Sequence, residues 1–198
     1  MQHGERASAI GNAERLGPVA PGDMSEAQRA AVEAFTAGRG YQPLGPFWVL
    51  LRSPEVMLRT KALGDYLRLR NSLPNAISEL AIIYTARQWT QQFEWLHHAA
   101  FAREAGLAEE IIEAIADGRR PERMSAAEAA AYDLAAELQA NRRVSDRTYA
   151  RALEQFGEQG LVDLVGVQGY YTMLAMAMNV ARTKLPEGTP EPLTRFPE

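Results

Sequence analysis

A chain of 198 residues is long enough for one domain with a buried core, and 46% hydrophobic with 23% charged residues is typical of a soluble globular protein. The net charge of -4 and the absence of long Lys or Arg tracts argue against binding to nucleic acid. The chain has no cysteine, which excludes disulfides, thiolate nucleophiles, cysteine-based zinc sites and dithiol redox cycles, and which fits a cytoplasmic protein.

The first part of the chain predicts an extension followed by a capped helix. Residues 1–22 lack the apolar stretch of a signal peptide, and we expect them to form a flexible extension. Ser25 with Gln28 has the spacing of a capping box, which predicts a helix that stops at Gly38. A connector rich in Gly and Pro follows at 38–47.

Caps, glycines and apolar periodicity predict the remaining elements, all of them helical. Ser53 and Pro54 open a helix, and Ser125 with Glu128 forms a second capping box. We expect helices at 53–70, two within 76–105, and others at 108–118, 125–139, 145–157 and 161–183. No strand pattern or internal repeat is present, so the fold class is all-α. We predict one helical domain over 23–185 and an extended, Pro-rich arm at 186–198.

The last predicted helix is as long as a membrane span but is interrupted by polar residues. Asp163, Gln168 and Asn179 lie within it, and its two glycines weaken it as a helix. An apolar helix with small residues all round is typical of a buried helix rather than a span. One small domain can hardly bury all of 161–180, so we expect a homo-oligomer and no membrane partner.

The candidate chemistry lies in residues 78–107, where Glu94 and His98 are four residues apart and share one helix face. A carboxylate beside an imidazole is a proton-transfer pair, because the carboxylate fixes the tautomer and raises the pKa of the His. The alternative is a solvated Glu–His pair on the surface. The apolar neighbours, among them Phe93, Trp95 and Phe101, favour the buried pair.

Glu79 can join this pair only if the chain reverses direction between them. In one unbroken helix, Glu79 and Glu94 would lie roughly 22 Å apart. The functional interpretation therefore requires a break near 88–91, with Thr90 as a plausible N-cap of the second helix. In the alternative interpretation, Glu79 is a first-turn carboxylate favoured by the helix dipole.

The same stretch also contains candidate ligands for a metal ion or an anion. Glu94 and His97 form an ExxH pattern, but a di-iron bundle needs a second such motif, and the third His is His3 near the N-terminus. A single metal on Glu79, Glu94 and His98 stays an alternative, although we expect neither a metal nor a cofactor. Four arginines flank the region and could hold an anionic substrate or lie in solvent: Arg68, Arg70, Arg87 and Arg103.

The segment ELAIIYTARQWTQQFEWLHHAAFAREAGL resembles the core of the carboxymuconolactone decarboxylase family, within the alkyl hydroperoxidase D-like superfamily. The piece FEWLHH looks like the family signature, and LVDLVGVQGYYTMLAMAMNV with LPEG resembles its last helix and exit. The similarity covers roughly residues 44–190. The spacing of the peroxidase branch places its Glu at Glu79, its two cysteines at Gln91 and Glu94, and its His at His98. Both cysteines are absent, so peroxidase chemistry is not available.

The resemblance implies an all-helical acid–base enzyme that forms trimers or hexamers. Its catalytic residues would be Glu79, Glu94 and His98, with Glu94 orienting His98, and its substrate a small carboxylated lactone or related cyclic acid. Decarboxylation with carbon protonation, isomerisation and cyclisation all stay open. The expected substrate-binding residues are Arg87, Trp95, His97 and Tyr171. The rival hypothesis is a non-catalytic helical oligomer that binds a small molecule or a protein partner.

Overall fold

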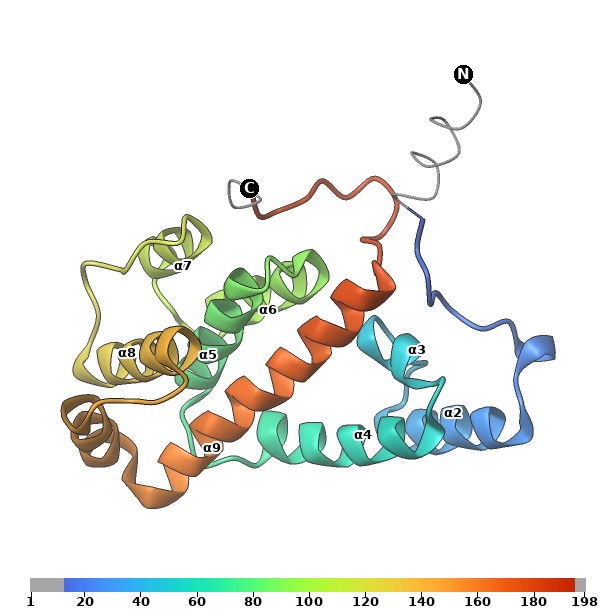
Figure 1. Cartoon of the computed structure of the whole chain (residues 1–198), viewed down its shortest axis with the longest axis horizontal. Coiled ribbons are helices and arrows are strands. Elements are labelled where there is room, and N and C mark those ends of the chain that lie inside the picture. The colour runs from blue at the N-terminus through green and yellow to red at the C-terminus, as the bar shows by residue number, and fades with distance from the viewer. Residues whose placement is uncertain (1–12, 195–198) are drawn as a thin grey trace.

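A computed structural model describes residues 13–194, and within this range the chain is all-helical, as predicted (Figure 1). The elements are the 3-10 turn η1 (Pro21–Asp23), α2 (Glu26–Arg39), α3 (Pro46–Leu50), α4 (Pro54–Leu69), α5 (Asn75–Gln88), α6 (Gln92–Glu104), α7 (Glu109–Ala116), α8 (Ala126–Asn141) and α9 (Asp146–Ala181). The predicted arm at 186–198 has no helix as far as Thr194, and its last four residues lie outside the described range, as do residues 1–12 of the predicted extension.

Helix α5 is the centre of the main core. Ten of its fourteen residues are buried, including Leu80 and Ile83, which are fully inaccessible. It packs against α6, α8 and α9, while α2, α3 and α4 gather a second core around Phe35 and Met57. Neighbouring helices cover α5 on nearly every side, and its apolar residues accordingly lie all round the helix rather than along one face. Helix α9 runs diagonally across both parts (Figure 1).

The first predicted helix is correct at its start, and its predicted end at Gly38 is one residue too early. Ser25 and Gln28 form the capping box, but the helix continues to Arg39 and ends at Gly40, which has φ 74°. The expected connector also contains α3, which was not predicted. Gly45 opens it with φ 45°, and a Cβ there would lie 2.3 Å from the Phe93 ring. Glycine therefore allows the start of α3 to approach the Phe93 ring of α6 closely.

The required break between α5 and α6 is present, although its cap differs from the prediction. Gln91, not Thr90, is the N-cap residue, and its side chain accepts hydrogen bonds from the amides of Phe93 and Glu94. Thr90 instead adopts φ 44° in the turn. The side-chain amide of Gln91 donates a hydrogen bond to the side-chain oxygen of Asn179 in α9. The side-chain amide of Asn179 in turn donates to the backbone carbonyl of Trp89, so Asn179 fixes this turn against α9.

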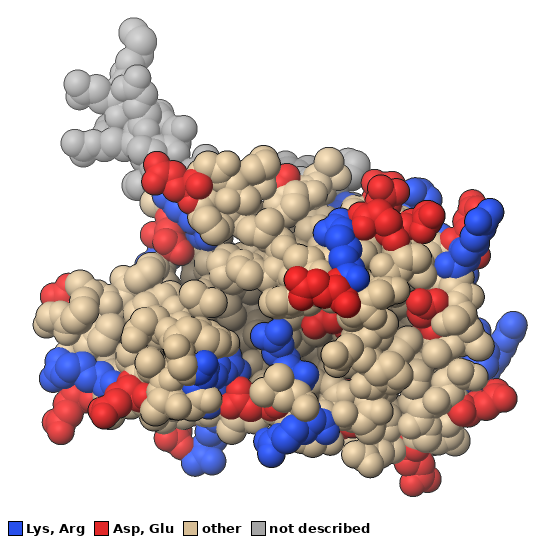
Figure 2. Space-filling model, turned by 180° about the vertical axis from the view of Figure 1, so that it is seen from behind, with Lys and Arg blue, Asp and Glu red and all other residues tan. Residues whose placement is uncertain are grey.

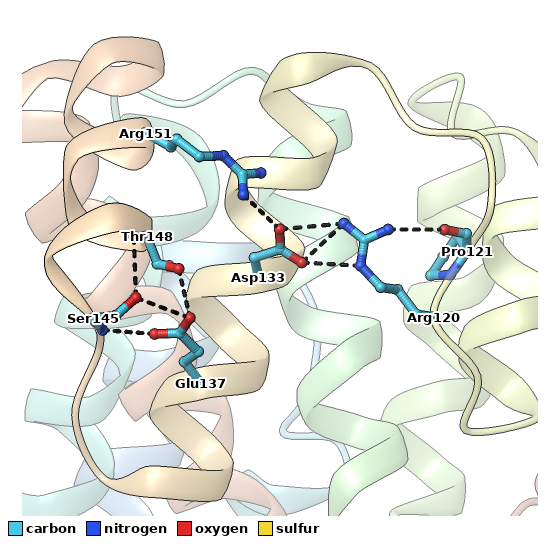
Figure 3. Close-up of polar contacts among 7 residues, drawn as sticks. All are labelled: Arg120, Pro121, Asp133, Glu137, Ser145, Thr148 and Arg151. Atoms are coloured by element: carbon cyan, nitrogen blue, oxygen red, sulfur yellow. Dashed lines mark hydrogen bonds and ion pairs between the residues drawn. The ribbon is translucent and has the colours of Figure 1, made fainter.

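A polar network fixes the connection between α8 and α9 (Figure 3). Glu137 of α8 accepts from the backbone amide of Ser145 at 2.6 Å and from the hydroxyl of Thr148 at 2.6 Å, so it supports the start of α9. Asp133, one turn earlier, pairs with Arg120 and with Arg151 of α9. The predicted end of a helix at Gly157 appears as a kink within α9, with φ 66°.

Helix α9 is the one helix of residues 13–194 that is long and apolar enough to cross a membrane by length and composition. Its most apolar window has a mean hydropathy of 1.2, and half of that window is buried inside the protein. Asp163, which argued against a span, is 5% exposed and accepts hydrogen bonds from Ser72 and Tyr66. This part of α9 therefore packs as a helix of the core.

Candidate active site

A cavity of about 410 Å³ lies where α2, α3, α4, α6 and α9 meet. Most of its wall is apolar, with Phe47, Phe93, Phe101, Leu174 and Met178 among the lining residues. Its polar lining includes Arg39, Arg68, Glu94, His97, His98 and Tyr171. A cavity of this size and character suits a small molecule with an apolar body and a few polar groups. The view from behind shows a hollow near the middle of that face, with both basic and acidic side chains around it (Figure 2).

His98 is oriented by Glu79, not by Glu94 as the sequence predicted. Nδ1 of His98 donates to Oε2 of Glu79 at 2.7 Å, across the turn between α5 and α6. The donor is assigned to His98 because a carboxylate oxygen only accepts. The helix-face argument that paired Glu94 with His98 failed because the neighbouring helix offers a better acceptor. With Nδ1 engaged, Nε2 is the ring nitrogen left for a ligand.

Burial makes His98 a neutral base at physiological pH. Burial lowers the pKa of His98 from 6.5, by more than the hydrogen bond to Glu79 raises it, and the positive charge of Arg68 lowers it further. This direction is opposite to the raised pKa expected from the sequence. The ring also packs edge-on against Tyr171, with centroids 4.8 Å apart. A neutral imidazole with a fixed tautomer can accept a proton through Nε2.

Glu94 is the buried acid of the same cavity. It is 3% exposed, and neither carboxyl oxygen has a hydrogen-bond partner among the described residues. Burial raises the pKa of Glu94 well above 4.5, because nothing compensates the charged form. Glu94 therefore favours the protonated form and can donate a proton or a hydrogen bond to a ligand.

Two of the four expected substrate-binding residues, His97 and Tyr171, line the cavity. Nδ1 of His97 interacts with the carbonyl of Phe93 at 2.8 Å, and its ring stacks on Phe93 with centroids 4.3 Å apart. Burial raises the pKa of Tyr171 well above 10, so its hydroxyl stays protonated. The adjacent histidines thus reach the same cavity, although their directions on α6 differ.

The other two expected residues, Arg87 and Trp95, lie elsewhere. Arg87 is 3% exposed and donates to the carbonyl of Thr194 at 3.0 Å, so it fastens the C-terminal arm. Trp95 is buried and lines a separate groove with Arg103 and Pro192. Neither residue lines the cavity, because α5 and this face of α6 point away from it.

Sequence reasoning missed Arg39 as a cavity residue. The predicted stop at Gly38 places Arg39 in the connector, whereas it is the last residue of α2. Arg68, one of the four arginines that flank the predicted site, also lines the cavity. Among residues 13–194, no group of three or more His, Asp or Glu side chains is placed to hold a metal ion.

Comparisons with known proteins place the fold. No protein-family model matches the sequence, and no curated protein matches it. Solved structures of the debrominase Bmp8 are similar: a cysteine-to-alanine variant in complex with 2,3,4-tribromopyrrole, and the apo form. Each has a TM-score of 0.66 at 10% sequence identity and covers 87% of this chain, with 91% and 92% of the Bmp8 chains covered. The chain therefore has the helical fold of Bmp8, consistent with the alkyl hydroperoxidase D-like fold.

Proposed function

We propose that the protein is an acid–base enzyme that moves a proton to or from carbon in a small carboxylated cyclic acid. The observation that carries this proposal is the convergence of a neutral base and a neutral acid on one apolar cavity: His98, held by Glu79, and the unpartnered Glu94. Pairs of groups whose surroundings push their pKa values apart are typical of acid–base sites.

The roles follow from the protonation states. Nε2 of His98 removes a proton from a carbon next to a carbonyl, while Glu94 gives its proton to the carbonyl oxygen, which forms an enol. Glu79 stabilises the imidazolium that results. Return of a proton to the same or another carbon, and of the hydroxyl proton to Glu94, completes an exchange or an isomerisation. If the substrate first loses CO2, the same groups would protonate the resulting enolate.

Thiol chemistry is outside this proposal. The positions that match the two cysteines of the peroxidase branch hold Gln91 and Glu94, and the 198 residues contain no cysteine. Gln91 serves as the N-cap of α6, and Glu94 faces the cavity. The Bmp8 structure with 2,3,4-tribromopyrrole is of a variant in which a cysteine of Bmp8 is replaced by alanine. This chain has no cysteine that could correspond to it.

The second candidate is a small-molecule binder without catalysis. The apolar wall of the cavity would serve a binder equally well. A binding role does not explain why Glu94 is buried without a hydrogen-bond partner. A buried, unsatisfied carboxyl group lowers the stability of the fold, and a protein that only binds its ligand could avoid this loss with an uncharged residue such as Met at this position.

Deuterium exchange tests the proposal without knowledge of the natural substrate. 4-Oxocyclohexane-1-carboxylate has exchangeable protons beside its ketone and a size that suits the cavity. We expect the protein to accelerate their exchange in D2O, followed by NMR. His98→Ala and Glu79→Ala should each lower the rate roughly 10²–10⁴-fold, and the double variant should be scarcely worse than the poorer single one.

His97→Gln is the matched comparison, although it also lines the cavity. The His97→Gln variant should retain most of the exchange activity, because Nδ1 of His97 interacts with the carbonyl of Phe93 in its own helix. Exchange no faster than that produced by free imidazole at the same concentration would rule out the proposed function and leave the binder.

A further inference from the structure

Two guanidinium groups, Arg39 of α2 and Arg68 of α4, line the same cavity as Glu94 and His98. We propose that Arg68, supported by Arg39, is an anion-binding subsite that holds a substrate carboxylate which the reaction leaves in place. The site then isomerises its substrate rather than removing that carboxylate as CO2. This inference rests on the proposed acid–base function, and it decides between reactions that the function leaves open.

Arg39 is fixed before any ligand arrives. Its Nε and Nη2 both contact Oδ1 of Asp65, at 2.9 and 2.8 Å, and its guanidinium lies 4.9 Å from the Phe35 ring and 4.8 Å from the Phe47 ring. Burial lowers the pKa of Arg39, but the hydrogen bond to Asp65 and nearby charges raise it by more, so the group stays charged. Its Nη1 contacts the hydroxyl of Tyr41 at 3.5 Å, and the guanidinium also forms a hydrogen bond with the side chain of Tyr170.

Arg68 is the cation without a counter-charge. No ion pair or hydrogen bond of its guanidinium is formed with any described residue, and its contact is with the face of Phe101, 5.2 Å from the ring centroid. Its charge reaches the chemical groups of the cavity, because it lowers the pKa of both His98 and Tyr171. A guanidinium that stacks on an aromatic ring does so with its flat face. The N–H donors lie in the plane of the guanidinium itself and stay free to bind a carboxylate.

The balance of charge around the cavity is positive. Glu94 favours its neutral form, and Glu79 is engaged with His98 behind the cavity wall. Asp65 is shared between Arg39 and Lys61, so this group of three carries one net positive charge. Arg68 adds a second, and the carboxylate of Glu79 beside the neutral His98 offsets one of the two, so the balance stays positive. The fitting ligand is an organic anion with an apolar ring.

Retention of the carboxylate follows from what the two cations do during reaction. An enzyme gains rate only from interactions that are stronger in the transition state than in the bound substrate. A carboxylate that leaves as neutral CO2 loses its ion pair with Arg68 on the way, so this contact would oppose decarboxylation. A carboxylate that stays keeps its ion pair throughout, and the C–H proton moves to Nε2 of His98 while the carbonyl oxygen takes the proton of Glu94.

Binding of matched probes tests the subsite independently of turnover. Cyclohexanecarboxylate and cyclohexanecarboxamide have nearly the same shape and differ in charge. Titration calorimetry should show that the wild type prefers the carboxylate at least tenfold and that Arg68→Gln weakens its binding roughly ten- to hundredfold, with little change for the amide. Arg70→Gln, two residues further on and outside the cavity lining, is the control and should change neither. Equal binding of the two probes, or no binding, would overturn the subsite.

Two keto acids then test retention. The protein should exchange the protons beside the ketone of 4-oxocyclohexane-1-carboxylate, and should not accelerate CO2 release from the β-keto acid 2-oxocyclohexane-1-carboxylate. Accelerated release of CO2 that is lost in Arg68→Gln would contradict retention. Preference for the carboxylate without any exchange would instead keep the subsite and contradict the acid–base function, so the two failures are distinguishable.

Discussion

At the residue scale, Glu94 combines a functional position with a cost in stability. Its folded pKa is raised, whereas a Glu in an unfolded chain has a pKa of about 4.3. Between these two values the folded state binds the proton and the unfolded state does not, so stability falls as pH rises. Below about pH 4.3 both states are protonated and the burial of Glu94 carries no such cost.

We therefore expect Glu94→Gln to be more stable than the wild type at neutral pH, because the amide fills the same space without a charge to be lost. The gain should be about 1.4 kcal/mol for each unit of pKa shift that is removed, and it should grow from pH 5 upward. Urea unfolding at pH 5 and pH 8 measures it. Glu104→Gln, on the exposed side of the same helix, should show no such trend. A wild type more stable than Glu94→Gln at pH 8 would contradict a neutral, buried Glu94.

At the element scale, Asp163 of α9 fastens the loop between α4 and α5. It accepts from the backbone amide of Ser72 at 2.9 Å, from its hydroxyl at 2.8 Å and from Tyr66 at 3.0 Å. Burial raises the pKa of Asp163, but these hydrogen bonds lower it by more, so the folded pKa lies below the unfolded one. The carboxylate therefore stabilises the fold above about pH 3.9, and this contribution is lost as pH falls through the folded pKa.

Asp163→Ala leaves the amide of Ser72 and the hydroxyl of Tyr66 without their acceptor. We expect a loss of about 1–3 kcal/mol in the free energy of unfolding at pH 7. The difference from the wild type should narrow as the pH falls through the lowered folded pKa of Asp163, where the carboxylate becomes protonated. Glu158→Gln, exposed on the same helix, is the control. Equal stability of Asp163→Ala and the wild type at pH 7 would show that the loop does not depend on this contact.

Local signals predicted elements well, whereas contacts between elements decided the site. Both capping boxes, Ser25 with Gln28 and Ser125 with Glu128, form as predicted, because all their atoms lie within four residues. The pairing of His98 with Glu79 depends on how α6 folds back on α5, and the sequence alone gave no distance between them. Arg39 was missed for the same reason, since α2 is brought to the cavity by its packing on α3 and α4.

At the scale of the whole molecule, α9 leaves an apolar stripe in solvent. Val162, Val165, Met176 and Val180 are exposed by 66, 43, 49 and 63%. At about 100° per residue they fall on one side of the helix, along roughly 27 Å of its length. No other helix of the described chain lies in front of α9 in Figure 1. Contiguous apolar surface of this kind marks a contact with another protein or with a membrane.

We propose that a second copy of the chain covers this stripe, which gives the homo-oligomer expected from the sequence. A charge placed in such an apolar contact must be buried without a partner, so Val165→Arg should dissociate the oligomer while α9 still packs on the core through its opposite face. Sedimentation velocity at micromolar concentration should give the oligomer for the wild type and for Val56→Arg, an equally exposed valine on α4, and a folded monomer for Val165→Arg. A wild type that sediments as a monomer would contradict the oligomer. A wild type that needs detergent to stay in solution, and loses that need with Val165→Arg, would assign the stripe to a membrane surface instead.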